Sequence, residues 1–505
     1  MLFRSRSNGA SRSPGPPWLN IGSITITITI SSPEPLTAVS ADSATADGAT
    51  AVDGVFCCRA LRLDQVALVG FDLDYTLAVY HQPAMDAVTI AAILRRLPGL
   101  GYPDEVMELP CPSGFATRGL LVDIDRGNVL KMDRHRYVKA AYHGTTRLSR
   151  PARRDLYEAR RPQPGDGGFR WVDTLYSLPD IAVYVALVDF LDERYENSGD
   201  VEPVDYAQVY RDVRSCADAA HHNGEIYAAI LAAPDRFLRS DDRLANALHR
   251  LRSSGKRLFL LTNSTLPSAE ALLSYLLDGA TAQYPGWRQF FDVVIVEAAK
   301  PSFFVEGSPF SDMAQTNTKP TGDVDAFRRG HTYRGGNRAD FERLIGESGD
   351  RILYVGDHVY GDVLRPNRSG GWRTVMVLQE LADEHAADEA CAEALRELAQ
   401  CDAELLRLHD ELRELRTQPT RGRNVERLSE RIRRLEAVRD RREDEIDTRY
   451  HPYWGSLFKA GAELSIFGAQ VEQYAWLYCD RVGTLAGYSP MHYFRPPRAR
   501  MPHER

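Results

Sequence analysis

The sequence has few cysteines, and they lack the spacing of a disulfide framework or a zinc site. There are seven, an odd number: Cys57 and Cys58 are adjacent, the others are scattered, and no C-x-x-C pair occurs. Small disulfide-bonded domains and structural zinc sites carry cysteines in regular pairs. We therefore expect a protein of a reducing compartment, and we predict a cytoplasmic location.

Long apolar runs and an excess of positive charge are also lacking. No run approaches the roughly 18 apolar residues of a membrane helix, and the best one, at 181–191, is interrupted by Asp189. The net charge of -8 gives no sign of a nucleic-acid partner. We expect neither membrane nor nucleic acid as a partner. The 505 residues suffice for two or three domains around a large core.

The first 55 residues differ in composition from the rest of the chain. They are rich in Ser, Ala, Thr, Gly and Pro, and they lack the continuous apolar core of a signal peptide. Residues 24–30 alternate like a strand, but nothing nearby offers that strand a partner. We predict that residues 1–55 are a mostly disordered extension.

Two aspartates mark the end of the first strand that the sequence predicts. An apolar run at 65–69 precedes Asp72 and Asp74, and residues two apart in an extended chain point to the same side. Open α/β sheets bind their ligands at such strand ends. Two carboxylates this close need a cation or a shared proton, and Mg²⁺ is the simplest solution. One carboxylate could then act as nucleophile and the other as acid and base. The alternative is a strand end with two solvated acids.

Thr262, Asn263 and Ser264 follow a second apolar run, at 258–261. Hydroxyl and amide groups in this place can hold the oxygens of a phosphoryl group without adding charge. Such residues also cap helices, and the helical pattern that starts at Pro267 makes Ser264 or Thr265 the expected N-cap.

Lys300 and two further aspartates complete the series of polar strand ends. Lys300 comes just past a third predicted strand, at 291–297. Its ammonium group could neutralise charge on a phosphate and on the nucleophilic carboxylate. The alternative is an ordinary solvated lysine. Asp357 ends a fourth strand and is placed to bind a metal. Asp362 could reach the metal through water or orient Lys300. Four such stretches in sequence favour a phosphoryl-transfer site over solvated surface residues.

This order of motifs resembles that of the haloacid dehalogenase superfamily of phosphohydrolases. Within it, the sequence from about 56 to 505 resembles the cytosolic purine 5'-nucleotidase family, of the type that prefers IMP and GMP. The segments that carry this likeness are Gly70-Phe-Asp-Leu-Asp-Tyr-Thr-Leu, Lys300-Pro-Ser-Phe-Phe, Tyr354-Val-Gly-Asp-His-Val-Tyr-Gly-Asp-Val, Gly455-Ser-Leu-Phe, Gln470-Val-Glu-Gln-Tyr-Ala-Trp-Leu-Tyr and Met501-Pro-His-Glu.

The resemblance implies a role for each polar residue. Asp72 would form an aspartyl-phosphate, and Asp74 would protonate the leaving nucleoside oxygen and then activate water. Mg²⁺ would be held by Asp72, the backbone carbonyl of Asp74 and Asp357, with Asp362 beside it. The phosphoryl group would be held by Thr262, Asn263 and Lys300, with Ser264 as a further substrate-binding residue.

The resemblance also places a base pocket on the expected cap. Arg214, Asp218 and His221 have helical spacing and share one face, so a buried Arg-Asp pair could bind a purine edge. Tyr176 could stack on a base. Ser177 stands where the family has Asn, and His222 where it has Tyr.

Beyond the core, the sequence predicts three further features. Residues 119–133 read as a β-hairpin with its turn at 125–128. Residues 131–245 are predicted to be mostly helical, as part of a cap over the active site. Between 384 and 449, a heptad seam predicts an antiparallel helical hairpin that either contacts another subunit or closes on itself. Its residues are Leu398, Cys401, Leu405, Leu408, Leu412 and Leu415, then Val425, Leu428, Ile432 and Leu435.

We therefore predict an α/β fold with a haloacid dehalogenase-like parallel sheet, a mostly helical cap and a C-terminal helical hairpin. Its predicted parts are an extension at 1–55, core at 56–84, cap and flap at 85–245, core at 246–383, hairpin at 384–449, and a segment at 450–505 that packs on the core.

The expected activity is Mg²⁺-dependent hydrolysis of nucleoside 5'-monophosphates, with purine monophosphates as the first candidates. The same intermediate could pass its phosphoryl group to a nucleoside. A phosphatase for another small phosphomonoester and a non-catalytic scaffold are the alternatives. Because the family is oligomeric, we expect a dimer or tetramer.

Overall fold

The computed structural model describes residues 54–159, 161–163, 167–198, 203–313, 324–417, 423–498, 501 and 503. Residues 49–505 form one compact unit. The predicted extension at 1–55 lies outside the described residues, except for its last two. No helix in the described part of the chain is long and apolar enough to cross a membrane.

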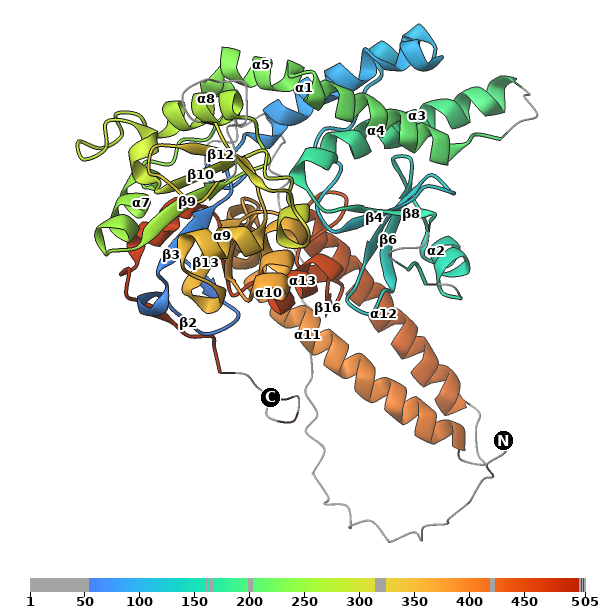
Figure 1. Cartoon of the computed structure of the whole chain (residues 1–505). Helices are drawn as coiled ribbons and strands as arrows, with labels where there is room; N and C mark the ends of the chain where they lie inside the picture. Colours follow the sequence, from blue (N-terminus) through green and yellow to red (C-terminus); the bar gives the residue numbers. More distant parts are fainter. Residues whose placement is uncertain are drawn as a thin grey trace, which may run out of the picture. The chain divides into compact units, whose positions relative to one another are not determined.

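A nine-stranded sheet forms the centre of this unit (Figure 1). Seven strands run parallel, and one antiparallel strand lies at each edge. In spatial order the strands are β1 (Phe56–Cys57), β17 (Leu477–Cys479), β14 (Arg373–Val377), β13 (Ile352–Gly356), β3 (Leu68–Phe71), β9 (Arg257–Leu261), β10 (Val293–Val296), β12 (Thr332–Gly335) and β11 (Phe310–Asp312). The four strands predicted from apolar runs are therefore neighbours, although the first begins at Leu68 rather than at residue 65.

Alternate residues of the central strands pack against different helices. Val69 and Leu258 belong to the apolar cluster that includes α7 (Leu244–Ser253) and α8 (Leu266–Leu277). Leu68 and Phe259 belong to a second cluster with Phe341 of α9 (Arg338–Ile345). Both faces of the sheet are thus covered, which explains why the strands read as continuous apolar runs. Gly70 allows close packing, because an added Cβ would lie 2.0 Å from the Phe259 ring.

The cap has a helical part and a sheet that the sequence analysis missed. Four helices pack on one another: α1 (Gln82–Leu94), α3 (Leu178–Ser198), α4 (Tyr206–His222) and α5 (Glu225–Ala232). A separate five-stranded antiparallel sheet has the order β7-β6-β5-β4-β8. Its elements are β4 (Leu120–Asp123), β5 (Asn128–Met132), β6 (Val138–His143), β7 (Thr146–Arg147) and β8 (Phe169–Val172), with α2 (Arg150–Tyr157) between β7 and β8.

The predicted hairpin is confirmed as β4 and β5, with Asp123 opposite Asn128. The prediction that residues 131–245 are mostly helical is wrong for its first third, where β6, β7 and β8 lie. β7 and β8 are short, and β6 contains Lys139 and Ala140, which are poor strand formers. Pairing with β5 and β4, rather than local propensity, therefore fixes their conformation.

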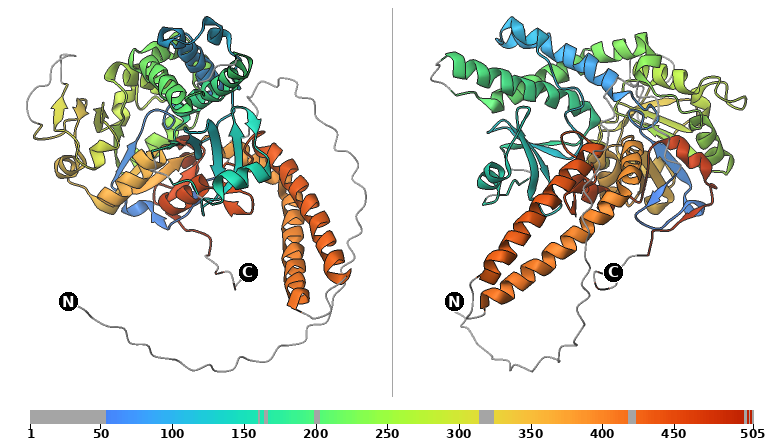
Figure 2. Two further views of the ribbon diagram at one scale, coloured as in Figure 1. Left: turned by 90° about the vertical axis from the view of Figure 1, so that its right-hand side faces the viewer. Right: turned by 180° about the vertical axis from the view of Figure 1, so that it is seen from behind.

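Two long helices form the C-terminal hairpin, α11 (Leu381–Thr417) and α12 (Arg423–Tyr450), which lie side by side (Figures 1 and 2). The pairs Arg431–Glu404 and Arg439–Asp402 show that they run antiparallel. Eight of the predicted seam residues form one apolar cluster between the helices: Leu405, Leu408, Leu412, Leu415, Val425, Leu428, Ile432 and Leu435. The seam therefore closes within one chain, which is the second of the two predicted alternatives.

The parallel sheet, the helical part of the cap and the hairpin confirm the predicted α/β fold. The segment after the hairpin returns to the core: β17 extends the sheet, and α13 (Ile466–Tyr474) packs beside it. Trp454 donates a hydrogen bond from Nε1 to the carbonyl of Phe115, 2.6 Å away. All seven cysteines are unpaired.

Candidate active site

The polar residues predicted at four strand ends lie at one edge of the sheet. β13, β3, β9 and β10 are consecutive neighbours and parallel, so their carboxyl ends meet. Asp72 follows β3, Thr262 follows β9, Lys300 comes four residues after β10, and Asp357 follows β13. This is the edge at which open α/β sheets bind ligands.

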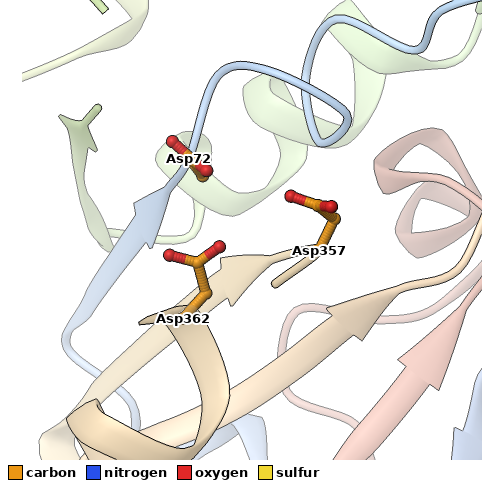
Figure 3. Close-up of side chains that lie close together, drawn as sticks. All are labelled: Asp72, Asp357 and Asp362. Atoms are coloured by element: carbon orange, nitrogen blue, oxygen red, sulfur yellow. The ribbon is translucent and has the colours of Figure 1, made fainter. Parts of the chain in front are cut away.

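Three carboxylates gather there. Oxygens of Asp72, Asp357 and Asp362 all lie within 4.8 Å of one another, and Figure 3 shows the three groups around a common space. Asp357 is 5% and Asp362 1% exposed. Burial raises the pKa of Asp72 to about 7, although the Lys300 ammonium acts in the opposite direction. Burial also raises the pKa of Asp357, and the Arg118 guanidinium opposes that shift.

Lys300 neutralises part of this negative charge. Its Nζ lies 2.9 Å from Oδ1 of Asp72 and 2.7 Å from Oδ1 of Asp362, and it donates to the hydroxyl of Tyr354 at 2.9 Å. Burial works against the charged form, but the two carboxylates outweigh it and raise the pKa of Lys300 above its usual value. Tyr354 in turn donates to the carbonyl of Leu261, which fixes the phenol.

Asn263 and Thr262 hold the backbone around the site. The Lys300 N–H donates to Oδ1 of Asn263 at 2.6 Å, and Nδ2 of Asn263 donates to the Lys300 carbonyl at 3.0 Å. Thr262 Oγ1 accepts from the N–H of Ser264 at 3.0 Å. The expected side-chain cap on α8 is absent: Thr265 is its N-cap residue, but its side chain makes no capping bond, and the Ser264 hydroxyl points to Asp74 instead.

Asp74 is not part of the carboxylate cluster. Its Oδ1 accepts from the Tyr80 hydroxyl at 2.6 Å, and its Oδ2 accepts from the Ser264 hydroxyl. The hydroxyl of Tyr227, on cap helix α5, lies 3.2 Å from both oxygens. The Asp74 side chain is therefore held by hydroxyl groups rather than by the carboxylate cluster.

Arg118 is the main site residue that the sequence analysis missed. Its side chain is fully buried, and Nη1 donates to the carbonyl of Asp357 at 2.8 Å and lies 3.6 Å from its Oδ2. Nε and Nη2 donate to both oxygens of Glu380, at 2.8 and 2.6 Å. Arg118 precedes β4 and so connects the cap to the edge of the core where the three carboxylates gather. Nothing local in the sequence marks it, since its partners are more than 230 residues away.

We expect Arg118→Met to lower the free energy of unfolding by about 3 kcal/mol. The substitution removes the cation that neutralises the carboxylates of Asp357 and Glu380. Urea unfolding at pH 7 measures this change. The matched control is Arg154→Met, which breaks an exposed pair with Glu158 and should not shift the midpoint. An equal effect of the two substitutions would contradict a buried structural role for Arg118.

The residues predicted for the base pocket come together on the cap. The Tyr176 ring packs edge-on against the rings of Tyr75 and His221, with centroids 4.8 and 5.3 Å apart. Nη1 of Arg214 lies 3.4 Å from the hydroxyl of Ser177. Burial, followed by the Arg214 charge, lowers the pKa of His221.

The expectation of a buried Arg214–Asp218 pair is wrong in one respect. The two groups are 2.9 Å apart, but the Asp218 side chain is 55% exposed. The buried partner of Arg214 is Asp180, whose side chain is 1% exposed. Burial raises the pKa of Asp180 to about 7, against the effect of the arginine. The sequence did not mark Asp180 because it lies on a different helix, α3.

The donor set fits a hard divalent cation. All three clustered groups are carboxylates, the ligands that Mg²⁺ and Ca²⁺ prefer. Among the residues that the structure describes, the ion pairs of these three acids with buried cations involve Lys300 and Arg118. Burial and, after it, the negative charge of Asp362 raise the pKa of Asp72, and an added positive charge would oppose both effects.

Comparison with known proteins agrees with the sequence motifs. The model of the 5' nucleotidase family matches residues 55–505. A 5'-nucleotidase domain-containing protein of Dictyostelium discoideum is 28% identical over 461 residues, which cover 89% of this chain and 74% of that protein.

Solved structures of other proteins match this chain at low similarity. The protein CbbY of Rhodobacter sphaeroides, in complex with phosphate, is 15% identical, with 62% of this chain and 86% of that chain covered and a TM-score of 0.24. An archaeal β-phosphoglucomutase of Pyrococcus is 9% identical, with 62% and 86% covered and a TM-score of 0.29.

Proposed function

This chain belongs to the 5' nucleotidase family, and we propose that it hydrolyses nucleoside 5'-monophosphates to nucleoside and phosphate through an aspartyl-phosphate. The observation that carries the proposal is the pair of differently held aspartates. Asp72 lies in the carboxylate cluster beside Lys300, whereas Asp74 is held apart by three hydroxyl groups. Two neighbouring carboxyl groups in different environments can serve as nucleophile and as acid.

In the first half-reaction, a carboxylate oxygen of Asp72 attacks phosphorus while the bond from phosphorus to the 5'-oxygen breaks. Asp74 gives its proton to that oxygen, so the nucleoside leaves as an alcohol. In the second half-reaction, Asp74 takes a proton from water as the water oxygen attacks the phosphoryl group, and Asp72 is released. A nucleoside hydroxyl in place of water would give phosphoryl transfer.

Positioning of the substrate and electrostatic stabilisation of the transferring phosphoryl group are expected to supply most of the rate acceleration. Lys300 lies where it can contact both Asp72 and a phosphoryl oxygen. Thr262, Asn263 and Ser264 follow β9 at the same edge and can bind the remaining oxygens. Asp72, the carbonyl of Asp74 and Asp357 would hold Mg²⁺, with Asp362 nearby. The bound ion supplies positive charge that offsets the charge of the transferring group.

The cap supports a purine as the base, with IMP and GMP as first candidates. Arg214 and Asp218 offer donors and acceptors to a purine edge, and Tyr176 and His221 offer ring surface. One observation favours another small phosphomonoester as second candidate. Tyr176 is already packed between Tyr75 and His221, and Ser177 presents a short side chain that Arg214 contacts.

A substrate panel tests this proposal. We expect phosphate release from IMP or GMP with Mg²⁺, loss of at least about 100-fold when EDTA removes the ion, and recovery on adding Mg²⁺. Sugar phosphates and pyrimidine monophosphates serve as controls for base recognition. Turnover of a non-nucleotide alone would keep the mechanism and reject the substrate class. No turnover of any ester would favour a scaffold role.

The location and the assembly are part of the same proposal. We propose a cytoplasmic enzyme on the basis of the family resemblance and the unpaired cysteines. We also propose a homodimer or homotetramer, whose contact would use surfaces other than the closed apolar seam of the hairpin. Light scattering of the purified chain measures the mass directly.

A further inference from the structure

Tyr227 is the cap residue that reaches the acid-base carboxylate. It lies on α5, and its hydroxyl is 3.2 Å from each oxygen of Asp74 and 2.8 Å from the hydroxyl of Ser264. The sequence motifs do not include it, because it stands outside all four strand ends.

The three hydroxyl groups around Asp74 come from different parts of the fold. Tyr80 follows β3 in the core, and Ser264 follows β9. Tyr227, in contrast, lies on a helix that packs on α1 and α4 of the cap and on α8 of the core. Of these three donors, only Tyr227 is carried by a cap helix.

The contact geometry fits an orienting role. The Tyr227 hydroxyl is within hydrogen-bond reach of both carboxyl oxygens and of the Ser264 hydroxyl, so it connects the position of the Asp74 carboxyl group to a cap helix. By comparison, the Tyr80 hydroxyl donates to Oδ1 of Asp74, and the Ser264 hydroxyl donates to Oδ2. A general acid must point its proton at the leaving oxygen, and small misplacements are costly.

We propose that Tyr227 is a positioning residue that orients Asp74 for proton transfer to the leaving oxygen, and that it does so only when the cap is docked on the core. This inference rests on the proposed function. Tyr227 keeps its own proton throughout: the ester bond breaks, the Asp74 proton goes to the leaving oxygen, and the resulting carboxylate continues to accept from the phenol.

The test is Tyr227→Phe, which removes the hydroxyl and keeps the ring. A nucleoside leaving group needs protonation, whereas p-nitrophenolate does not. We expect kcat/KM to fall about 30-fold for a nucleoside monophosphate and less than about threefold for p-nitrophenyl phosphate. Because kcat/KM reports steps up to the first irreversible one, hydrolysis of the aspartyl-phosphate does not affect this comparison. Asp74→Asn should show the same selectivity more strongly.

Two further variants separate orientation from structure. Tyr206→Phe removes a cap hydroxyl that donates to Asp192 at 2.7 Å, away from the site, and should change neither substrate. Tyr227→His keeps a ring with an N–H donor and should recover part of the loss on the nucleoside ester. A His variant no better than Phe would contradict a hydrogen-bonding role.

The outcomes distinguish this inference from the proposed function. If wild type hydrolyses only non-nucleotide esters, the proposed substrate fails, and an alkyl phosphate such as glycerol 3-phosphate replaces the nucleotide in the comparison. If wild type is active and Tyr227→Phe affects both ester types equally, or neither, the inference alone fails. If wild type hydrolyses no ester, both fail.

Discussion

Asp72→Asn is expected to abolish hydrolysis of nucleoside monophosphates, with a loss of at least about 10⁴-fold in kcat. An amide oxygen is a poor nucleophile, and the substitution removes the covalent intermediate rather than weakening one contact. The structure adds a second reason. Asp72 belongs to the carboxylate cluster, so the amide also removes one anionic ligand for the divalent ion.

The measurement is phosphate release at saturating Mg²⁺, with the unfolding midpoint determined in parallel. Asp350→Asn is the matched control, since it changes an exposed carboxylate that pairs with Arg373 and should leave kcat unchanged. The variant protein should also remain folded, because replacing a buried anion by a neutral isostere removes a desolvation cost. Activity within tenfold of wild type would exclude Asp72 as the nucleophile.

Lys300→Met is expected to lower kcat/KM about 10³-fold. The substitution removes the ammonium that lies between Asp72 and Asp362, so substrate and both carboxylates lose their nearest cation. It also has a pH signature. Lys300 holds the pKa of Asp72 below the value that burial alone would give. Without it, Asp72 needs a higher pH to ionise, so the acid limb of the kcat/KM profile should move to higher pH.

The pH profile is measured from about 5 to 9 at fixed, saturating Mg²⁺. Lys459→Met removes an exposed lysine and serves as control for the loss of one charge. A large fall in kcat/KM with an unmoved acid limb would mean that Lys300 binds substrate without acting on Asp72. An acid limb displaced to lower pH would contradict the charge arrangement itself.

The strand-end residues could be predicted because each follows its own apolar run. Asp72, Lys300 and Asp357 stand directly after buried strands or a few residues beyond, and parallel strands bring such ends to one edge. The assignment of separate environments to Asp72 and Asp74 could not be predicted. It depends on hydroxyl groups, above all that of Tyr227, which lies 153 residues away in sequence.

The cap was harder to predict for the same reason. The β6 and β8 strands contain Lys139 and Arg170 and lack clean alternation, so long-range pairing rather than local pattern determines them. Asp180 and Arg118 likewise act through contacts between distant segments. In the hairpin, the heptad pattern located the apolar seam correctly. It did not distinguish a seam that packs against another subunit from one that closes within the chain.

The central claim is that Asp72 carries the phosphoryl group, and acid quenching during turnover tests it most directly. Wild type is mixed with IMP and Mg²⁺, quenched within the first turnovers, digested and mapped by mass spectrometry. We predict one phosphoryl group on the peptide that contains Asp72, and none in Asp72→Asn treated identically. Phosphate release without that modified peptide, or a phosphoryl group on another residue, would contradict the mechanism.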